Sequence, residues 1–226
     1  MESVLQLHEI PKEFKIKRLG SGQNGTCYLT SDNRVFKEYH TKGMDDKITR
    51  SLLNLNYDGF NFPRQLVFID GIFKGYLKDY VEGDTLDKIN ALTEIRNLVS
   101  GLCYFEDSLM DLSYEECLYV YDLNLHNLIY SNGKIYDIDT DPIAPFDFPF
   151  ANPYYENRKE LANALERDYM RGPFKSSTLN DLVHESLVEG ISRPSLFIIE
   201  AIKEMEKDTK IKTIKDYKKG LVLLRK

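Results

Sequence analysis

Three oxygen-bearing side chains follow one another at a spacing that suits phosphoryl transfer. Asp122 and Asn127 stand five positions apart, and Asp139 comes after a predicted hairpin with its turn at Ser131-Asn132-Gly133. One carboxylate can orient an attacking hydroxyl and accept its proton, while an amide oxygen and a second carboxylate hold Mg²⁺ against phosphate oxygens. Asp and Asn also cap turns at strand ends, and each of these residues alone would more often do only that.

A glycine-rich turn and a lysine precede these residues. The pattern GxGxxG is formed by Gly20, Ser21, Gly22, Gln23, Asn24 and Gly25. It lies between two predicted strands rather than before a helix, so it fits a hairpin over phosphates better than a dinucleotide-binding loop. Lys37 follows in the apolar segment Val35-Phe36-Lys37, where its ammonium can neutralise α- and β-phosphate charge. A strand lysine with apolar neighbours is more often an exposed-face residue, and such glycines often serve only a turn.

The first third of the chain is predicted to be β-rich and the rest mainly helical. Apolar and basic residues alternate over 14–19, which predicts a strand. Further strands are predicted over 26–30, 34–39, 65–70 and 75–81, with turns at 31–33 and 70–71 and a short helix over 44–55. Helical spacing begins at Thr85, a strand pair over 118–121 and 128–138 interrupts it, and helices follow over 156–169, 178–189 and 195–207. This order predicts an α+β fold of two lobes, residues 1–80 and 81–226, with a hinge near 80–83.

The order of these motifs resembles the protein kinase family and its small-molecule kinase relatives. The match runs from about residue 15 to residue 140 in the family's order: GxGxxG, strand lysine, hinge, DxxxxN, hairpin and aspartate. The resemblance implies a bilobal kinase-like fold, with a β-rich N-terminal lobe and a mainly helical C-terminal lobe. It also implies ATP and Mg²⁺ as cofactors.

The resemblance assigns roles to individual residues. Asp122 matches the catalytic-loop aspartate, Asn127 the metal-binding asparagine and Asp139 the metal-binding aspartate. The segment 79–83 looks like the hinge, where the backbone of Asp79 and Val81 would hold adenine, and Val35 falls where a small apolar residue contacts the ring. Lys37 matches the lysine that contacts the α- and β-phosphates.

Several positions depart from the family pattern. The catalytic motif reads Val120-Tyr121-Asp122, without the usual His and Arg, and the metal motif reads Asp139-Thr140-Asp141, without glycine. Asp137 competes with Asp139 for the metal position. The predicted helix over 44–55 holds no glutamate for Lys37, so Asp45 or Asp46 is the available substitute. No Ser or Thr lies between Asp141 and Lys175, so we expect no control by Ser/Thr phosphorylation there.

The acceptor is the most open part of the prediction. Asn124 replaces the lysine that protein Ser/Thr kinases carry two positions after the catalytic aspartate, and His126 is the nearest histidine. We expect an ATP-dependent phosphotransferase that acts on a protein Ser/Thr hydroxyl. The alternatives are a small-molecule kinase, a pseudokinase that binds a nucleotide or partner without turnover, and a scaffold with an empty cleft.

Composition restricts the partners and the compartment. The net charge of −6 and pI of about 5.4 argue against nucleic acid as the main partner. Three widely spaced cysteines favour a reducing cytoplasm over a disulfide framework, and no stretch approaches the ~20 apolar residues of a membrane span. We therefore expect a cytoplasmic protein with partners limited to ATP and a hydroxyl acceptor.

Overall fold

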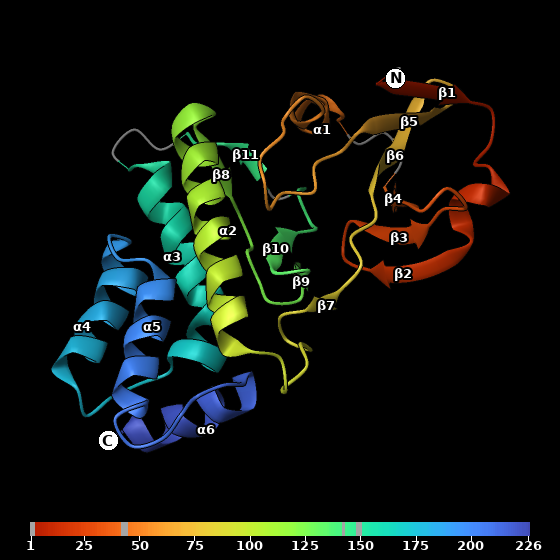
Figure 1. Cartoon of the computed structure of the whole chain (residues 1–226). Coiled ribbons are helices and arrows are strands. Elements are labelled where there is room, and N and C mark those ends of the chain that lie inside the picture. Colours follow the sequence, from red (N-terminus) through yellow and green to blue (C-terminus); the bar gives the residue numbers. More distant parts are fainter. Residues whose placement is uncertain (1–2, 42–44, 142, 148–150) are drawn as a thin grey trace. The chain divides into compact units, whose positions relative to one another are not determined.

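The chain forms two compact units, which we describe separately. The computed structural model describes residues 3–41, 45–141, 143–147 and 151–226. Unit 1 comprises Met1–Asn56 and Phe60–Val81, and unit 2 comprises Tyr57–Gly59 and Glu82–Lys226. Unit 1 is built mainly from strands and unit 2 mainly from helices (Figure 1). The predicted α+β class, with a β-rich N-terminal part and a helical C-terminal part, is confirmed.

Unit 1 is a six-stranded sheet in the order β1-β5-β6-β4-β3-β2. Neighbouring strands are antiparallel except β1 and β5, which are parallel. The strands are β1 Val4–Leu7, β2 Lys17–Ser21, β3 Gly25–Leu29, β4 Arg34–Tyr39, β5 Gln65–Ile69 and β6 Ile72–Asp79. A 3₁₀ turn, Lys12–Lys15, and a short helix, α1 Lys47–Leu52, complete the described part of the unit.

Alternating side chains divide the β4 strand between two apolar clusters. Phe36 packs with Val67 and Leu77 on one face of the sheet, where the N-terminal segment adds Leu5, Leu7, Ile10 and Phe14. Tyr39 packs on the other face with Leu66, Phe73 and Tyr76. Since successive strand residues point to opposite faces, Val35 and Lys37 share the face of Tyr39. The sheet is therefore buried on both sides of β4, and this fixes the side to which Lys37 points.

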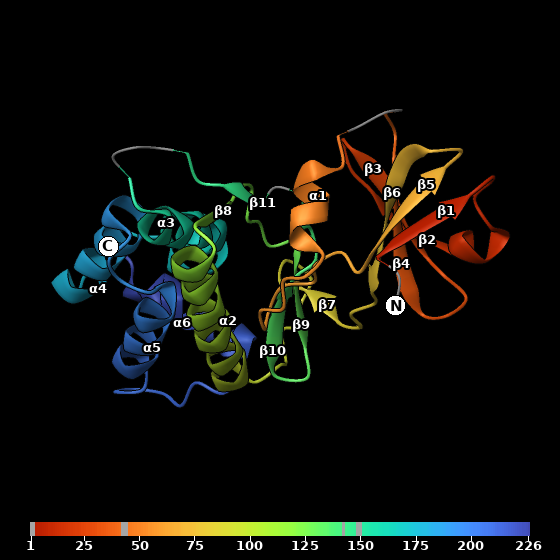
Figure 2. The same ribbon diagram turned by 90° about the horizontal axis from the view of Figure 1, so that it is seen from above.

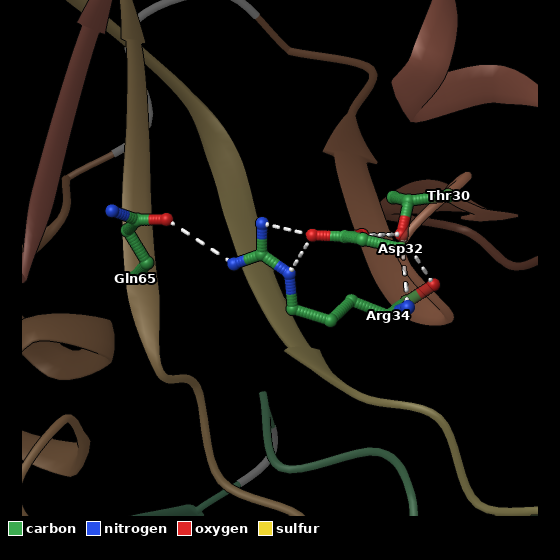
Figure 3. A network of polar contacts seen from close by, with 4 residues as sticks. All are labelled: Thr30, Asp32, Arg34 and Gln65. Atoms are coloured by element: carbon green, nitrogen blue, oxygen red, sulfur yellow. Dashed lines mark hydrogen bonds and ion pairs between the residues drawn. The ribbon is translucent and has the colours of Figure 1, made fainter. Parts of the chain in front are cut away.

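A polar network closes the turn that begins β4. The Thr30 hydroxyl and the Arg34 guanidinium both donate to the carboxylate of Asp32, at 2.5 Å and 2.7 Å (Figure 3). Arg34 also reaches Gln65 of β5, at 3.3 Å from its Oε1. The bonds from Arg34 and Thr30 lower the pKa of Asp32. The predicted turn at 31–33 is confirmed, and the network ties it to a strand far away in the sequence.

Unit 2 is organised around the long helix α2, Ile95–Glu115. Helices α3 and α5 flank it (Figures 1 and 2). The other helices are α3 Pro153–Leu165, α4 Ser177–His184, α5 Pro194–Met205 and α6 Ile214–Leu224, and one π-helical turn continues each of α3 and α4. Two small antiparallel sheets accompany the helices, β10-β9-β7 and β11-β8. Their strands are β7 Asp84–Thr85, β8 Leu118–Val120, β9 Leu128–Ser131, β10 Lys134–Asp137 and β11 Ile143–Pro145.

Two-residue turns set the register of two hairpins. Asp70-Gly71 joins β5 to β6, and Asn132-Gly133 joins β9 to β10. All four residues have positive φ, between 48° and 82°. Such turns favour Gly and Asn or Asp, which tolerate this backbone conformation, and match the twist of antiparallel strands. Both turns were predicted from sequence, and both are confirmed.

Three sequence predictions about local structure need correction. The helix predicted from Thr85 begins only at Ile95, because Thr85 pairs with Ile129 and the Leu86 N–H donates to the Leu128 carbonyl, so the chain runs beside β9. The first predicted strand is in part a 3₁₀ turn, since the Phe14 ring packs on Phe36 after Pro11. The short helix predicted over 44–55 covers only Lys47–Leu52, and its predicted first residue, Met44, lies outside the described residues.

Within the described part of the chain, every helix is too short or too polar to cross a lipid bilayer.

A buried carboxyl group joins α2 to the start of α5. Glu106 of α2 accepts hydrogen bonds from the backbone N–H and the hydroxyl of Ser195. Burial raises the pKa of Glu106 from its ordinary value of 4.5 to about 7, although Ser195, Arg193 and Arg158 oppose the shift. Between pH 4.5 and about 7, the Glu106 carboxyl is therefore protonated in the folded state and ionised in the unfolded state.

We expect the free energy of unfolding to fall as pH rises from about 4.5 to about 7. The raised pKa of Glu106 gives stability that is complete below 4.5 and is lost through 7. The loss is about 3 kcal/mol at most, since one pKa unit corresponds to about 1.4 kcal/mol. Glu106→Gln should remove most of this slope in thermal unfolding, whereas Asp111→Asn, an exposed change on the same helix, should keep it. A slope unchanged in Glu106→Gln would contradict the assignment.

Candidate functional site

The β9–β10 hairpin brings Asn127 and Asp139 together. Its last strand pair is Leu128 with Asp137, and beyond it the Ile138 N–H donates to the Asn127 carbonyl at 2.9 Å. Asp139 is the next residue, so the two predicted metal ligands flank the open end of the hairpin. Both residues are partly exposed. The backbones of the two predicted metal ligands are therefore neighbours in unit 2.

The loop before β9 is held by the side chain of Asn124. Its carboxamide oxygen accepts from the backbone N–H of His126 and of Asn127, at 3.0 Å and 3.2 Å. Its amide nitrogen donates to the Asp122 carbonyl at 3.1 Å. Leu123, in the same loop, is buried and anchors it. Asn124 thus fixes the backbone on both sides of itself. The sequence analysis named it only as a replacement for lysine, although the preference of Asn for such turns could have indicated this role.

Asp122 stands in an unusual backbone conformation at the start of this loop. Its φ is +57°, a left-handed value that non-glycine residues rarely adopt, and its side chain is exposed. Strained residues of this kind are enriched at functional sites. The bond from Asn124 helps to hold the strained turn, so the Asp122 carboxylate is presented to solvent from a fixed backbone.

Asp137 and Asp139 differ in what their carboxylates do. Asp137 is buried, and its Oδ1 accepts the backbone N–H of Asp139 at 3.0 Å. Its own N–H donates to the Gly59 carbonyl at 2.7 Å. Asp139 is more exposed, and its Oδ1 accepts the N–H of Asp141 at 3.4 Å. The geometry favours Asp139 over Asp137 as a metal ligand, because Asp137 orients the backbone that carries Asp139.

A histidine of the same loop forms an ion pair that the sequence did not reveal. His126 Nδ1 lies 2.8 Å from Asp87 Oδ2, and the imidazole is largely exposed while Asp87 is mostly buried. Burial alone would raise the pKa of Asp87, but the nearby Thr85 hydroxyl and the His126 imidazole lower it overall. The pair connects the loop to the segment after β7. No sequence spacing pointed to Asp87.

In unit 1, the predicted GxGxxG segment forms the tip of the β2–β3 hairpin. Gly20 pairs with Cys27 and Ser21 with Thr26, and the Gly22 N–H donates to the Gly25 carbonyl. A Cβ on Gly25 would lie 2.5 Å from the Glu38 carbonyl oxygen, so packing against β4 requires this glycine. A Cβ on Gly20 or Gly22 would meet no described atom within 4 Å. The chain's own packing therefore gives no reason for these two glycines.

His40 braces this hairpin from the end of β4. Its Nδ1 lies 3.3 Å from the Gln23 carbonyl oxygen, and its Nε2 lies 2.9 Å from the Thr26 hydroxyl. The carbonyl can only accept, so Nδ1 carries a proton and donates to it, while Nε2 bonds to the Thr26 hydroxyl. The Ser21 hydroxyl, 2.9 Å from that of Thr26, extends the chain of bonds. Sequence spacing alone did not indicate this role for an exposed histidine.

Lys37 is buried on β4, with 6% of its surface exposed. It pairs with Cys27 of β3 and with Tyr76 of β6. The two aspartates considered as its partners have cations of their own, since Asp46 pairs with Arg50 and Asp45 with Lys47. Helix α1 contains no acidic residue.

Two of the predicted adenine contacts, Val35 and Asp79, lie on neighbouring strands of the same sheet, and Val81 follows β6. Val35 is buried on β4, and β6 ends at Asp79, whose carbonyl accepts from the Asn61 amide at 2.8 Å. Val81 is the last residue of unit 1. A carbonyl oxygen has two lone pairs, so that of Asp79 keeps one position for a further donor.

The donor set of unit 2 suits magnesium better than zinc. Among the described residues, no three His, Cys, Asp or Glu side chains are grouped as a metal cage. Asn127 and Asp139 offer two hard oxygens, and Mg²⁺ in enzymes commonly takes one or two protein oxygens and fills its other positions with water and phosphate. The residues present therefore fit Mg²⁺ held jointly with a phosphate ligand.

Comparison with known proteins identifies the fold. No protein-family model and no curated protein matches the sequence. Two crystal structures of the PknI kinase domain from Mycobacterium tuberculosis, both double mutants, are similar to the chain, with TM-scores of 0.54 and 0.53. They share 13% and 14% identity with it, over 93% of this chain and 94% of each of theirs. The chain has a protein-kinase-like fold.

In this kinase-like fold, a buried asparagine positions the strand that leads to Asp122. Asn157 of α3 accepts from the Val120 N–H and donates to the Leu118 carbonyl and the Ser113 hydroxyl, all at 2.8–2.9 Å. It is fully buried, and every polar atom of its side chain is used. Nothing in the helical pattern of α3 distinguished this residue from a solvent-facing asparagine.

We expect Asn157→Ala to lower the free energy of unfolding by about 3 kcal/mol. The change leaves the Val120 N–H and the Leu118 carbonyl buried without their partner, and buried unsatisfied groups cost about 1–3 kcal/mol each. Asn163→Ala makes the same chemical change at an exposed site on the same helix and should stay within about 0.5 kcal/mol of wild type. Denaturant unfolding of both variants measures the difference, and equal losses would contradict the role of Asn157.

Proposed function

We propose that this chain is an ATP- and Mg²⁺-dependent phosphotransferase that moves the γ-phosphate to a hydroxyl group. The observation that carries the proposal is the approach of Asn127 to Asp139 at the open end of one hairpin, directly after the ordered loop of Asp122. The kinase-like fold supports it, because residues of these types occupy this order in that fold.

Asn127 and Asp139 would hold the metal ion through the amide oxygen and the carboxylate. Bound Mg²⁺ supplies positive charge that neutralises the phosphate oxygens during transfer. The buried Asp137 fixes the backbone N–H of Asp139 and so limits the directions in which the Asp139 carboxylate can point. A ligand fixed in this way loses little conformational freedom when the metal binds.

Asp122 would orient the acceptor hydroxyl and take its proton. The new bond forms between the acceptor oxygen and the γ-phosphorus, and the bond from that phosphorus to the leaving ADP oxygen breaks. Asp122 is exposed, and Asn124 fixes its backbone through a bond to the Asp122 carbonyl. This suits a carboxylate that must meet an incoming substrate. Asn124 acts here as a positioning residue.

In unit 1, the nucleotide would lie against the glycine hairpin and the face of β4. Gly20 and Gly22 carry no Cβ and leave space that a phosphate can approach. Lys37 would contact the α- and β-phosphates, Val35 the adenine ring, and the backbone of Asp79 and Val81 its polar edge. The proposal requires these residues and those of unit 2 to act on one nucleotide.

The acceptor we propose is a Ser or Thr hydroxyl of a protein, because the three-glycine loop and the segment after β6 resemble that branch of kinases. One alternative has specific support. Tyr121 stands in place of the usual arginine, and α1 offers no acid to Lys37. These departures favour a nucleotide-binding module without turnover. A small-molecule hydroxyl is the third possibility, and one assay separates all three.

Mg²⁺–ATP should raise the thermal midpoint of the wild-type chain. A ligand that binds only the folded state stabilises it by about 2.7 kcal/mol at about 100 times its Kd. The shift should require Mg²⁺ and should be lost in Asp139→Ala, while Asp181→Ala, an exposed change on α4, should keep it. No shift at millimolar ATP, or a shift equal in both variants, would contradict the proposed metal and nucleotide site.

Asp122→Asn should keep Mg²⁺–ATP binding but lower phosphate transfer by about 100-fold or more, because an amide cannot accept the hydroxyl proton. Transfer of γ-³²P to a generic protein substrate, to the chain itself and to small-molecule hydroxyls measures this. Label in protein supports the proposed acceptor, and label only in small molecules supports the third possibility. Binding without any transfer by the wild type would identify the module without turnover.

A further inference from the structure

His40 holds the tip of the β2–β3 hairpin through both its backbone and its ring. Its backbone N–H donates to the Asn24 carbonyl at 2.9 Å, and its ring Nδ1 donates to the Gln23 carbonyl at 3.3 Å. All three residues are exposed. Two bonds from one residue therefore fix the directions of two consecutive peptide groups at the surface of unit 1.

The bond to Gln23 determines where the next N–H group points. The peptide between Gln23 and Asn24 is trans, and in a trans peptide the carbonyl and the N–H point in opposite directions. The Gln23 carbonyl points to the His40 ring, so the Asn24 N–H points away from that ring. Among the described residues, none accepts a hydrogen bond from the Asn24 N–H. This donor is therefore available to a ligand.

The strand register shows on which face of the sheet the His40 ring lies. Ser21 pairs with Thr26, and Thr26 pairs with Glu38. Paired residues share a face, and His40 follows Glu38 by two positions, so all four side chains lie on one face. The contacts agree, since His40 Nε2 and the Ser21 hydroxyl each lie 2.9 Å from the Thr26 hydroxyl. Lys37, one position before Glu38, points to the opposite face.

The direction of the Asn24 N–H follows from these two observations. The His40 ring lies on the face opposite Lys37, and the N–H points away from the ring, toward the side of Lys37 and Val35. The nucleotide is proposed to lie on that side of the sheet. Phosphate oxygens accept strong hydrogen bonds from backbone N–H groups, because the phosphate is charged. His40 itself lies on the other face and does not touch the nucleotide.

We propose that His40 is a positioning residue, which directs the Asn24 N–H toward the phosphates of the nucleotide. The inference rests on the proposed function and adds a residue that acts from the far side of the hairpin. A change of the His40 side chain removes the ring bond to Gln23 but leaves the backbone bond to Asn24. It therefore frees one peptide group without separating the strands.

The test uses amide side chains to separate the two ring nitrogens. The side-chain nitrogen of Asn can occupy the place of Nδ1, and that of Gln the place of Nε2. His40→Asn therefore keeps a donor for the Gln23 carbonyl, whereas His40→Gln keeps only the bond to Thr26. His40→Phe removes both bonds. His8→Phe is the matched control, since His8 is an exposed histidine of unit 1 that pairs with Asp70 instead.

We expect His40→Phe and His40→Gln to bind Mg²⁺–ATP and Mg²⁺–ADP about tenfold more weakly, because the freed peptide group loses its hydrogen bond to a charged phosphate. Adenosine has no phosphate, so its affinity should be the same in every variant. His40→Asn should bind ATP more tightly than His40→Gln, and His8→Phe should bind it as the wild type does. Calorimetric titration measures these affinities.

Three results would overturn the inference. The first is an unchanged ATP affinity in His40→Phe. The second is an equal loss for ATP, ADP and adenosine, which would make His40 a support of the fold alone. The third is an equal loss of ATP affinity in His40→Asn and His40→Gln.

Thermal unfolding without nucleotide is measured first, and the comparison of His40→Asn with His40→Gln decides the matter if His40→Phe does not fold. If the wild type binds neither ATP nor ADP, the proposed function fails and the inference fails with it. That outcome needs no variant, so it is distinct from the three results that overturn the role of His40 alone.

Discussion

The register of the β9–β10 hairpin is the constraint on which the candidate site depends. The turn at Asn132-Gly133 allows only two residues between the strands, so Leu128 meets Asp137 and Asn127 meets Ile138. A slip by one residue would turn each strand side chain to the other face. Asp139 would then lose its place beside Asn127. The chemistry proposed for unit 2 thus begins with a turn that itself takes no part in it.

The buried charged side chains described in the two units have opposite signs. The buried charged residues described in unit 1 are two lysines, and those of unit 2 are the acids Glu106 and Asp137. In unit 2, backbone N–H groups satisfy both carboxyl groups, from Ser195 and from Asp139. The acids near α1 in unit 1 pair with cations of that segment instead.

Local signals explain which parts of the fold could be predicted. The turns at Asp70-Gly71 and Asn132-Gly133 require positive φ, and the residues that tolerate it stand in the sequence. The strand over 34–39 was predicted at its observed bounds because the turn residues 31–33 mark where it begins. Long-range pairing explains the failures. The spacing of apolar residues after Thr85 predicts a helix, but Thr85 pairs with Ile129, far along the chain, and forms a strand instead.

The residues of the candidate site also fall into those that local sequence signals indicate and those that depend on long-range contacts. Asp122, Asn127, Asp139 and Lys37 were predicted as site residues because their types and their order along the chain together suggest phosphoryl transfer, and this assignment stays a prediction. Asp87 and His40 were not predicted, since their roles depend on the contacts Asp87–His126 and His40–Gln23, which only folding brings together. Asn157 belongs to this second group, because its importance comes from complete burial rather than from any motif.

The central claim is that residues of both units act on one nucleotide. Hydrogen exchange followed by mass spectrometry, with and without Mg²⁺–ATP, tests it most directly. The account predicts simultaneous protection of the Gly20–Gly25 hairpin in unit 1 and of the 122–127 and 138–141 segments in unit 2, with the same dependence on ATP concentration. Protection confined to one unit, or protection of the two units at different ATP concentrations, would contradict it.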